Sequence, residues 1–404
     1  MQSKKFVKPL VLNALMVAVS VAAGQAMAQE FNSNQSQGRG VVFQQQPTAE
    51  QQPTAATPSG RSQTWPKGWD GRSQNWPGRS QHWNDGRGVR GSDFNRGQQY
   101  ADAVAGARDA NRFVQDRLTS RFIGLDPNYQ GAWFEILGDH GDHDDDGAID
   151  GYQFSYNGVQ AGGMFGVGDG WRVGGAFTYL DGRTKNGFDG HTDSNNYYFS
   201  LFADKTWGQF GLLGTVTYGF SDFDKTHRED SPSGRRQEAD YDGDVWTAGL
   251  EGRYDFLLDN GGKITPYAGI NYSHYKVDSF HEDGGEGAMQ AGSETYKDIW
   301  SNVGARYTSK AYDIAPNLTA KYYADLGWTH EFNSSDDNEL NLRMSRTGQV
   351  YKAESAELFG DAAVVKLGAE FAHLDKVSFG LNYTGMFADE TDEHAFNATV
   401  NVPF

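Results

Sequence analysis

Residues 394–404 read His-Ala-Phe-Asn-Ala-Thr-Val-Asn-Val-Pro-Phe, and this closing stretch indicates how the chain folds. Apolar residues alternate with polar ones from Phe396 to Val402, and the stretch stops on the aromatic Phe404. A period of two predicts a β-strand with one apolar face. Pro403 removes one backbone donor, which a strand tolerates only at its end.

The same alternation recurs from Gly131 to the C-terminus. In Trp171–Tyr179 and Leu318–Thr329 one face is apolar and aromatic, and the other is small, polar or charged. The pattern predicts twelve strands, at 131–138, 152–167, 170–180, 194–206, 209–221, 240–256, 263–279, 293–309, 315–331, 357–373, 376–388 and 394–404. The expected count is twelve plus or minus two, because residues 339–351 could pair as well.

The turns between these strands alternate in length. Short turns fall near 168–170, 207–208, 259–262 and 374–375, and long polar turns near 139–151, 181–193, 221–239, 280–292 and 331–356. A soluble β-sandwich would also show alternating strands, but its turns would be uniformly short. Short turns at one rim and long loops at the other are typical of transmembrane antiparallel β-barrels of the outer membrane.

Composition agrees with an all-β membrane protein. The mean hydropathy is −0.68 and 37% of residues are apolar, which suits a barrel in which only alternate residues face lipid. The chain has no cysteine, so neither disulfides nor thiolate metal sites contribute. Of the net charge of −18, residues 1–92 contribute about +6, which leaves residues 93–404 strongly acidic and argues against a nucleic-acid partner.

The N-terminus resembles a secretory signal peptide. Three lysines precede an apolar run at 9–23, and small residues, Ala26 and Ala28, stand at the two positions that a signal peptidase reads. We expect residues 1–28 to be removed before Gln29. The alternative, a membrane anchor, needs a longer apolar run than this one.

Residues 29–92 are of low complexity. Three Gly-Arg-Ser-Gln-x-Trp repeats occupy 60–65, 71–76 and 78–83. With few aliphatic residues this segment cannot bury enough surface to offset its chain entropy, so we expect it to be disordered or extended. It is either a flexible spacer or, because it is basic and rich in Trp, a segment that binds lipopolysaccharide or other sugars.

Residues 93–130 are expected to form a helix, at 93–122, and a connector. Asp93 can cap it, and apolar or small residues recur at spacings of three and four, at Tyr100, Val104, Ala107, Asn111, Val114, Leu118 and Phe122. At ~1.5 Å per residue such a helix is about 45 Å long. Its position directly before the first strand sets it apart from an ordinary amphipathic helix.

Residues ~93–404 resemble the translocator domain of autotransporters, the type V secretion proteins. The resemblance lies in the pre-barrel helix, Gly158–Gly163, Trp171–Gly175, Ile264–Gly269 and the terminal Phe. It implies an outer-membrane barrel of a Gram-negative bacterium that carries its own N-terminal segment to the cell surface. The expected partners are outer-membrane lipid and lipopolysaccharide, periplasmic chaperones, and the barrel-assembly machinery, which would read Phe396, Val400, Val402 and Phe404.

If the resemblance holds, the helix lies inside the barrel lumen. Charged lumen residues would then solvate it, namely Arg172, Glu251, Arg253, Lys321 and Glu370. The arginines of the helix segment, Arg108, Arg112, Arg117 and Arg121, would pair with acidic wall residues. Some family members release their passenger at an Asn-Asn pair in this helix, but Asn95 and Asn111 have no Asn beside them. A retained tail of about 64 residues is therefore expected.

Enzymatic motifs and cofactor sites are not evident in the sequence. There is no Gly-x-Ser-x-Gly, His-Glu-x-x-His or Gly-Lys-Ser/Thr motif, so we expect no enzyme and no cofactor. A weak calcium-loop candidate comprises Asp142, Asp144, Asp146 and Asp150, with Gly147 at the turn position. Gln153 replaces the bidentate Glu of such loops, so an acidic surface loop without metal is the preferred interpretation.

Two other functions remain compatible with the sequence. The protein could be a plain outer-membrane pore or structural barrel whose 29–92 segment stays periplasmic. It could also be a surface adhesion protein that binds through the Arg/Trp repeats.

Overall fold

The computed structural model describes residues 97–145, 149–186, 190–230, 235–285, 287–332, 338–356, 360–373 and 376–404. Its elements are α4 (Gln98–Ser120), β1 (Gly131–His143), β2 (Tyr152–Gly168), β3 (Trp171–Asn186), β4 (His191–Trp207), β5 (Phe210–Asp230), β6 (Arg235–Tyr254), β7 (Phe256–Leu257), β8 (Lys263–Val277), β9 (Phe280–His281), β10 (Met289–Ala291), β11 (Glu294–Thr308), β12 (Tyr312–Ala315), β13 (Leu318–Glu331), β14 (Glu339–Met344), β15 (Val350–Glu354), β16 (Asp361–His373), β17 (Val377–Phe387) and β18 (Thr391–Pro403).

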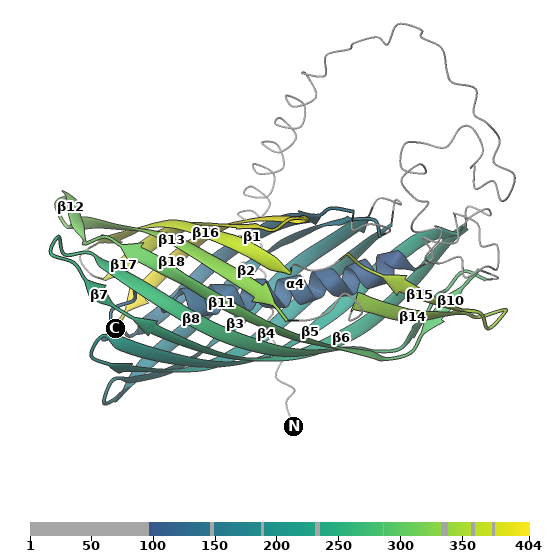
Figure 1. Ribbon diagram of the computed structural model, residues 1–404, viewed down its shortest axis with the longest axis horizontal. Coiled ribbons are helices and arrows are strands. Elements are labelled where there is room, and N and C mark those ends of the chain that lie inside the picture. The colour runs from purple at the N-terminus through teal and green to yellow at the C-terminus, as the bar shows by residue number, and fades with distance from the viewer. Residues whose placement is uncertain are drawn as a thin grey trace, which may run out of the picture. The chain divides into compact units, whose positions relative to one another are not determined.

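Twelve of these strands form a closed antiparallel barrel around α4 (Figure 1). Neighbours in sequence pair with each other, and β1 closes the ring on β18, from Gly131 opposite Pro403 to His143 opposite Thr391. Closure leaves no strand edge, so each wall strand shares hydrogen bonds with two neighbours. The expected all-β barrel of twelve strands with a preceding helix is confirmed.

The apolar face of the wall points outward and the polar face points into the lumen. On β4, Phe199 and Leu201 are 52% and 70% exposed, whereas Asp204 is fully buried. On β6, Leu250 is 51% exposed and the adjacent Glu251 is 2% exposed. This is the reverse of a soluble sandwich, which would bury its apolar face, and it is what a wall surrounded by lipid requires.

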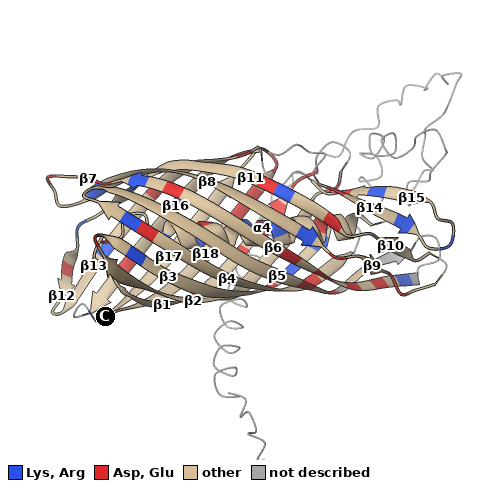
Figure 2. Ribbon diagram, turned by 90° about the horizontal axis from the view of Figure 1, so that it is seen from below, with Lys and Arg blue, Asp and Glu red and all other residues tan. Residues whose placement is uncertain are grey.

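The short turns at 168–170, 207–208 and 259–262 lie where the sequence places them, and 374–375 lies outside the described residues. Strands extend into each of the expected long turns. β5 and β6 continue to Asp230 and from Arg235, so the expected long turn at 221–239 is wrong for most of its length. β1, β3 and β4 extend in the same way into 139–151 and 181–193. These extensions carry polar residues on the outer face as well, so the alternation that marks the lower part of each strand disappears. Figure 2 shows the acidic positions on β5 and β6 near β9.

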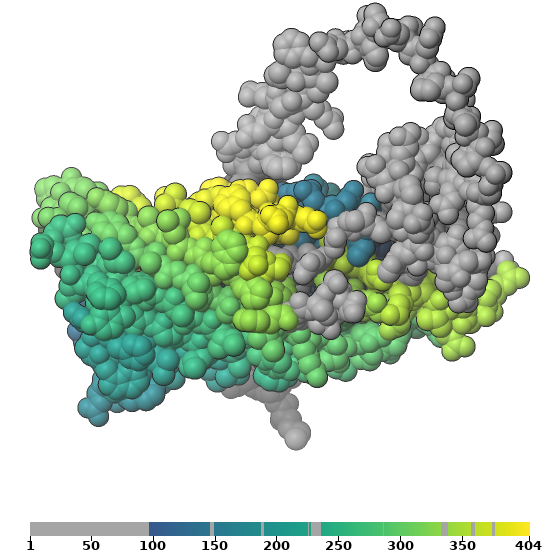
Figure 3. Space-filling view, viewed as in Figure 1, coloured from purple at the N-terminus to yellow at the C-terminus, as the bar shows by residue number. Residues whose placement is uncertain are grey.

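Residues 339–351 do pair, but outside the barrel. β15, β14, β10 and β9 form, in that order, a separate four-stranded sheet, here called the mouth sheet. It lies at the long-loop end of the barrel, opposite β7 and β12 (Figures 1 and 3). The long turns expected at 280–292 and 331–356 therefore contain strands, and the barrel count stays at twelve.

α4 is shorter than expected, and it is buried on all sides rather than amphipathic. Every residue from Gln98 to Ser120 except Asp116 is buried. The residue before the helix is Gly97, in a left-handed conformation, and not Asp93, which lies outside the described residues. Gly106 permits close approach to the wall, because a Cβ there would lie 2.6 Å from Thr184 Oγ1 and 2.9 Å from Tyr156 Oη.

An ion cluster ties three strands together inside the short-turn half of the barrel. Asp204 on β4 accepts hydrogen bonds from Arg172 on β3 and from Arg253 on β6, each at 2.5 Å. All three side chains are at least nine-tenths buried. Two buried guanidinium groups thus depend on one carboxylate for charge compensation.

Asp204→Ala is expected to lower barrel stability by about 3 kcal/mol, because it leaves two buried cations uncompensated. Thermal unfolding of the protein in detergent, followed by circular dichroism, measures the change.

The control is Asp193→Ala, which removes the partner of Arg183 in a pair whose side chains are 49% and 33% exposed. An exposed pair contributes at most about 1 kcal/mol. Equal losses in the two variants would mean that the cluster at Asp204 does not stabilise the wall.

Candidate functional site: the helix-filled lumen

The first turns of α4 pack against the mouth sheet. Tyr100 Oη donates to Glu282 Oε1 at 2.8 Å, and its ring centroid lies 4.6 Å from that of Phe280. Leu340 and Leu342 of β14 are fully buried in the same cluster. Gln98 Nε2 also donates to the carbonyl of Asp150, at 2.6 Å. The N-terminal end of α4 is therefore fixed at the long-loop end of the barrel.

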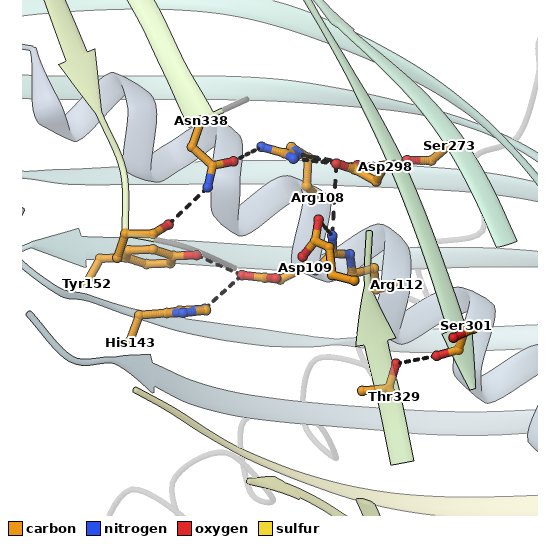
Figure 4. A network of polar contacts seen from close by, with 12 residues as sticks. Arg108, Asp109, Arg112, His143, Tyr152, Ser273, Asp298, Ser301, Thr329 and Asn338 are labelled. Carbon is orange, nitrogen blue, oxygen red and sulfur yellow. Dashed lines mark hydrogen bonds and ion pairs between the residues drawn. The ribbon is translucent and has the colours of Figure 1, made fainter. Parts of the chain in front are cut away.

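The middle of α4 is held by buried charges (Figure 4). Arg108 forms an ion pair with Asp298 of β11, and its Nη1 donates to Asn338 Oδ1 at 2.6 Å. Arg112 Nη2 lies 2.6 Å from Glu331 Oε1 at the end of β13. These residues join one face of the helix to two neighbouring wall strands.

The same turn also carries a carboxylate, on an adjacent part of the helix surface. Asp109 Oδ2 accepts a hydrogen bond from Tyr152 Oη at 2.9 Å and lies 3.2 Å from His143 Nε2. The other ring nitrogen of His143 lies 2.8 Å from Thr391 Oγ1. One helical turn thus contacts β11, β13, β1 and β2, which fixes its rotation about the helix axis as well as its height.

The C-terminal half of α4 is held by charges of both signs. Arg117 and Arg121 share the fully buried Glu135 of β1, with 2.9 Å between Arg121 Nη2 and Glu135 Oε2. Lys366 of β16 forms an ion pair with Asp116 and donates to Ser120 Oγ at 2.6 Å. Cationic side chains of the helix segment therefore pair with β1, and an anionic side chain pairs with β16.

Wall arginines also bind the carbonyl groups where α4 ends. Arg306 Nη1 donates to the carbonyl of Ser120 at 2.8 Å and of Ile123 at 3.0 Å. Arg172 Nη1 donates to the carbonyl of Asp126 at 2.8 Å. The last carbonyls of a helix have no partner within it and carry partial negative charge, so cations are favourable there.

Cavities remain beside the helix, and two of them are lined by both α4 and the wall in the described part of the chain. One of about 70 Å³ lies between α4 and the wall, and its lining includes Asp116, Tyr267 and Lys366. The other, of about 210 Å³, lies at the short-turn end, and its lining includes Arg306, Lys321 and Glu370. Both are small compared with an open pore, so α4 and its side chains occupy most of the lumen.

The sequence-based pairing of the four arginines is confirmed. Arg108, Arg112, Arg117 and Arg121 all bind acidic wall residues. The five expected lumen residues are all on the lumen side or line its cavities, but within the described residues none forms an ion pair with a side chain of α4. Arg172 and Arg253 bind Asp204 instead.

The acidic partners themselves were not predicted. Asp298, Glu331 and Glu135 each lie on the polar face of an alternating strand, which is the only signal the sequence offers. Many other carboxylates share that signal. The choice among them depends on how the strands are arranged around the helix.

The calcium-loop candidate falls across a strand end. Asp142 lies within β1, Asp145 Oδ1 accepts a hydrogen bond from the amide of Gly151 at 2.8 Å, and Asp146 lies outside the described residues. Over the described ranges, no group of three or more His, Cys, Asp or Glu is arranged to hold a metal ion. None of the helices in these ranges is both long and apolar enough to cross a membrane.

Two other predicted sites remain, the signal-peptide cleavage site and the C-terminal assembly signal. The structure gives the positions of the C-terminal residues alone. Ala26, Ala28 and the 29–92 segment lie outside the described residues. In β18, Phe396 and Val402 are 50% and 47% exposed and Val400 is half-buried, and Phe404, directly after the strand, is 65% exposed. Their side chains share the outer face of the wall. Recognition of this face by an assembly machinery stays a prediction.

Arg108→Glu is expected to dislodge α4, because it places a third carboxylate beside Asp298 and Glu331. Breaking a buried pair costs about 3 kcal/mol, so the unseated population should rise about a hundredfold. Single-channel recording in planar bilayers measures this as more frequent large-conductance openings.

The exchanged pair Arg108→Glu with Asp298→Arg restores opposite charges and should return the channel toward the closed state. Arg183→Glu, on the outer face, is the matched control and should leave conductance unchanged. Wild-type conductance in Arg108→Glu would contradict a structural role for the pair.

Comparison with known proteins agrees with this geometry. The family model "Autotransporter beta-domain" matches residues 132–384. One curated relative is an extracellular serine protease of Serratia marcescens, which is 26% identical over 318 residues, or 75% of this chain. Another is the putative uncharacterized protein YaiT of Escherichia coli K12, which is 24% identical over 280 residues, or 67% of this chain. The chain spans less than a third of the length of each, 30% and 27%.

Solved structures share the fold. The translocator domain of the autotransporter NalP from Neisseria meningitidis aligns with a TM-score of 0.63 at 16% identity, over 76% of this chain and 99% of that one. The β-domain of the Bordetella autotransporter BrkA aligns with a TM-score of 0.51 at 17% identity, over 68% of this chain and all of that one. The matched part includes the barrel that surrounds α4.

The family model covers well over half of the chain, and the fold, the outward apolar face and the helix-filled lumen agree with it. Proteins with this domain reside in the outer membrane of Gram-negative bacteria. The chain therefore belongs to the autotransporter family, and its barrel is an outer-membrane translocator.

Proposed function

We propose that the barrel carries residues 29–92 of its own chain to the cell surface and keeps α4 in its lumen afterwards. The direction of the helix is the observation that supports this. Gly97, which precedes α4, lies against Leu342 and Ala353 of the mouth sheet at the long-loop end. Long loops of outer-membrane barrels face the outside of the cell, so the segment before Gly97 leaves the barrel on that side.

We propose further that the exported segment stays attached. Ion pairs along α4, from Arg108 to Arg121, resist its departure from the lumen, and no Asn-Asn pair is present in the helix. The segment contains none of the nucleophile or metal motifs of enzymes, so its proposed role is non-enzymatic. Although a curated relative is named a serine protease, this chain spans less than a third of that protein.

An epitope inserted after Ala56 tests the direction of export. Antibody binding to intact cells, and loss of the epitope on protease shaving, are the expected results. A second epitope in the short turn at Asp169 serves as the matched control, and it should bind antibody only after permeabilisation.

Signal from the Ala56 epitope only in permeabilised cells would overturn the proposal in favour of a barrel with a periplasmic tail. Release of the epitope into the medium, without added protease, would contradict the retained tail alone.

We also propose that the outer face of β18 is read by the barrel-assembly machinery. Phe404→Ala is expected to reduce the amount of folded barrel in the outer membrane severalfold, because it truncates a terminal aromatic that is 65% exposed. Heat-dependent gel mobility of membrane fractions measures the folded amount.

Phe379→Ala on β17 is the control, since that ring is 53% exposed on the same lipid-facing surface. Equal yields from both variants would show that the terminal position has no special role.

A further inference from the structure

A β-bulge in β5 changes which of its side chains face outward. Phe223 lies opposite Tyr241 of β6, and Thr226 lies opposite Ala239, so β5 has one more residue than its partner between these pairs. Phe223 and Thr226 both point inward and are fully buried. Without the extra residue, His227 would point inward as Phe223 does. Bulges commonly re-aim a side chain next to a functional site.

The bulge aligns His227 with two residues on the neighbouring strands. His191 of β4 is its cross-strand partner on one side, and Glu238 of β6 is its partner on the other. The centroids of the two imidazole rings are 3.8 Å apart, and the rings are perpendicular at 89°. The Glu238 side chain is 48% exposed, which places this row on the outer face, and within the row His191 is partly buried and His227 is only 8% exposed.

Two adjacent imidazoles are a chelating pair for a transition metal. Side chains directly opposite on antiparallel strands have Cβ atoms about 5 Å apart, which lets two ring nitrogens reach one ion. Imidazole suits Zn²⁺, Cu²⁺ and Ni²⁺. Since no described group supplies three such ligands, water molecules would complete the shell. The carboxylate of Glu238, next to His227, is suited to accept the outward N–H of a ligating ring.

The local charge favours a cation. The positions below the row carry Asp193 on β4, Asp224 on β5 and Asp240 on β6. Two basic side chains, Arg183 beside Asp193 and Arg236 beside Glu238, compensate part of this charge at 2.6 and 2.5 Å. Lys185 of β3, the cross-strand partner of His191, adds a third cation, so four carboxylates face three cations among these described side chains.

We propose that His191 and His227 form a binding site for one divalent transition-metal ion at the long-loop ends of β4 and β5. These strands are joined at the Trp207–Phe210 turn, far from the histidines. A metal ion at the opposite end would cross-link the two strands where no turn connects them. The inference is independent of the direction in which the N-terminal segment is exported.

Titration of the purified full chain with Cu²⁺, in detergent and without a polyhistidine tag, tests the site. We expect one saturable equivalent per chain, which a large excess of Zn²⁺ displaces, since Cu²⁺ binds imidazole more tightly. His191→Gln and His227→Gln should each weaken binding at least tenfold. Unchanged heat-dependent gel mobility would show that both variants fold. Zn²⁺ should raise the thermal midpoint of the wild type and not of either variant.

His330→Gln is the matched control, because His330 is a 43% exposed histidine on the same end of β13, bound to Asp361. It should leave Cu²⁺ affinity unchanged. Binding in His227→Gln equal to that of the wild type would overturn the site. So would several weak equivalents that fall equally in all three variants, since this is the behaviour of scattered surface histidines.

Discussion

Lipid provides no hydrogen-bonding partner for the backbone, and the rest of this structure depends on that constraint. An isolated sheet would leave two edges unsatisfied, so the strands must close, and β1 pairs with β18 along its whole length. Closure of the sheet then gives the wall one face toward lipid and one face toward the lumen. Leu201 can be 70% exposed because lipid surrounds it, and Asp204 three residues later can be fully buried because it faces the lumen.

A polar lumen needs a polar partner, and α4 provides one. Its buried cations meet carboxylates from different parts of the wall, with Arg108 at β11, Arg112 at β13, and Arg117 at β1. Buried ion pairs add little net stability because both charges lose their hydration, but an unmatched buried charge is costly. A helix shifted by one turn would lose several matches together. The charges therefore specify one position of the helix more than they strengthen the barrel.

The sequence predicted the part of the structure that lies in lipid better than the part that lies in water. Phe199, Leu201 and Leu250 stand out because one face must be apolar at membrane depth. Above that depth the outer faces of β5 and β6 carry polar side chains, so residues such as Asp222 and Glu238 were expected in a loop although they lie in strands.

The sequence predicted the arginines of the helix but not the wall carboxylates that bind them. Four arginines at helical spacing mark α4 as a helix that needs anions, and this is a local property of the sequence. Their partners Asp298 and Glu331 are about 190 and 219 residues away from Arg108 and Arg112. Nothing in the local pattern separates these carboxylates from others on the same faces. The sequence indicated that residues 339–351 could pair but not that they form a separate sheet, since β10 and β14 are brought together by the barrel.

The mouth sheet also constrains the order of assembly. Its buried face includes Leu340, Leu342 and Met289, and much of what covers these side chains is the first two turns of α4. Wall residues such as Tyr241 and Tyr296 belong to the same cluster, and α4 supplies the rest of the apolar contact through Tyr100 and its neighbours. The packing of the mouth sheet is therefore coupled to the presence of α4 in the lumen, so loss of the helix would expose apolar surface at this end of the barrel.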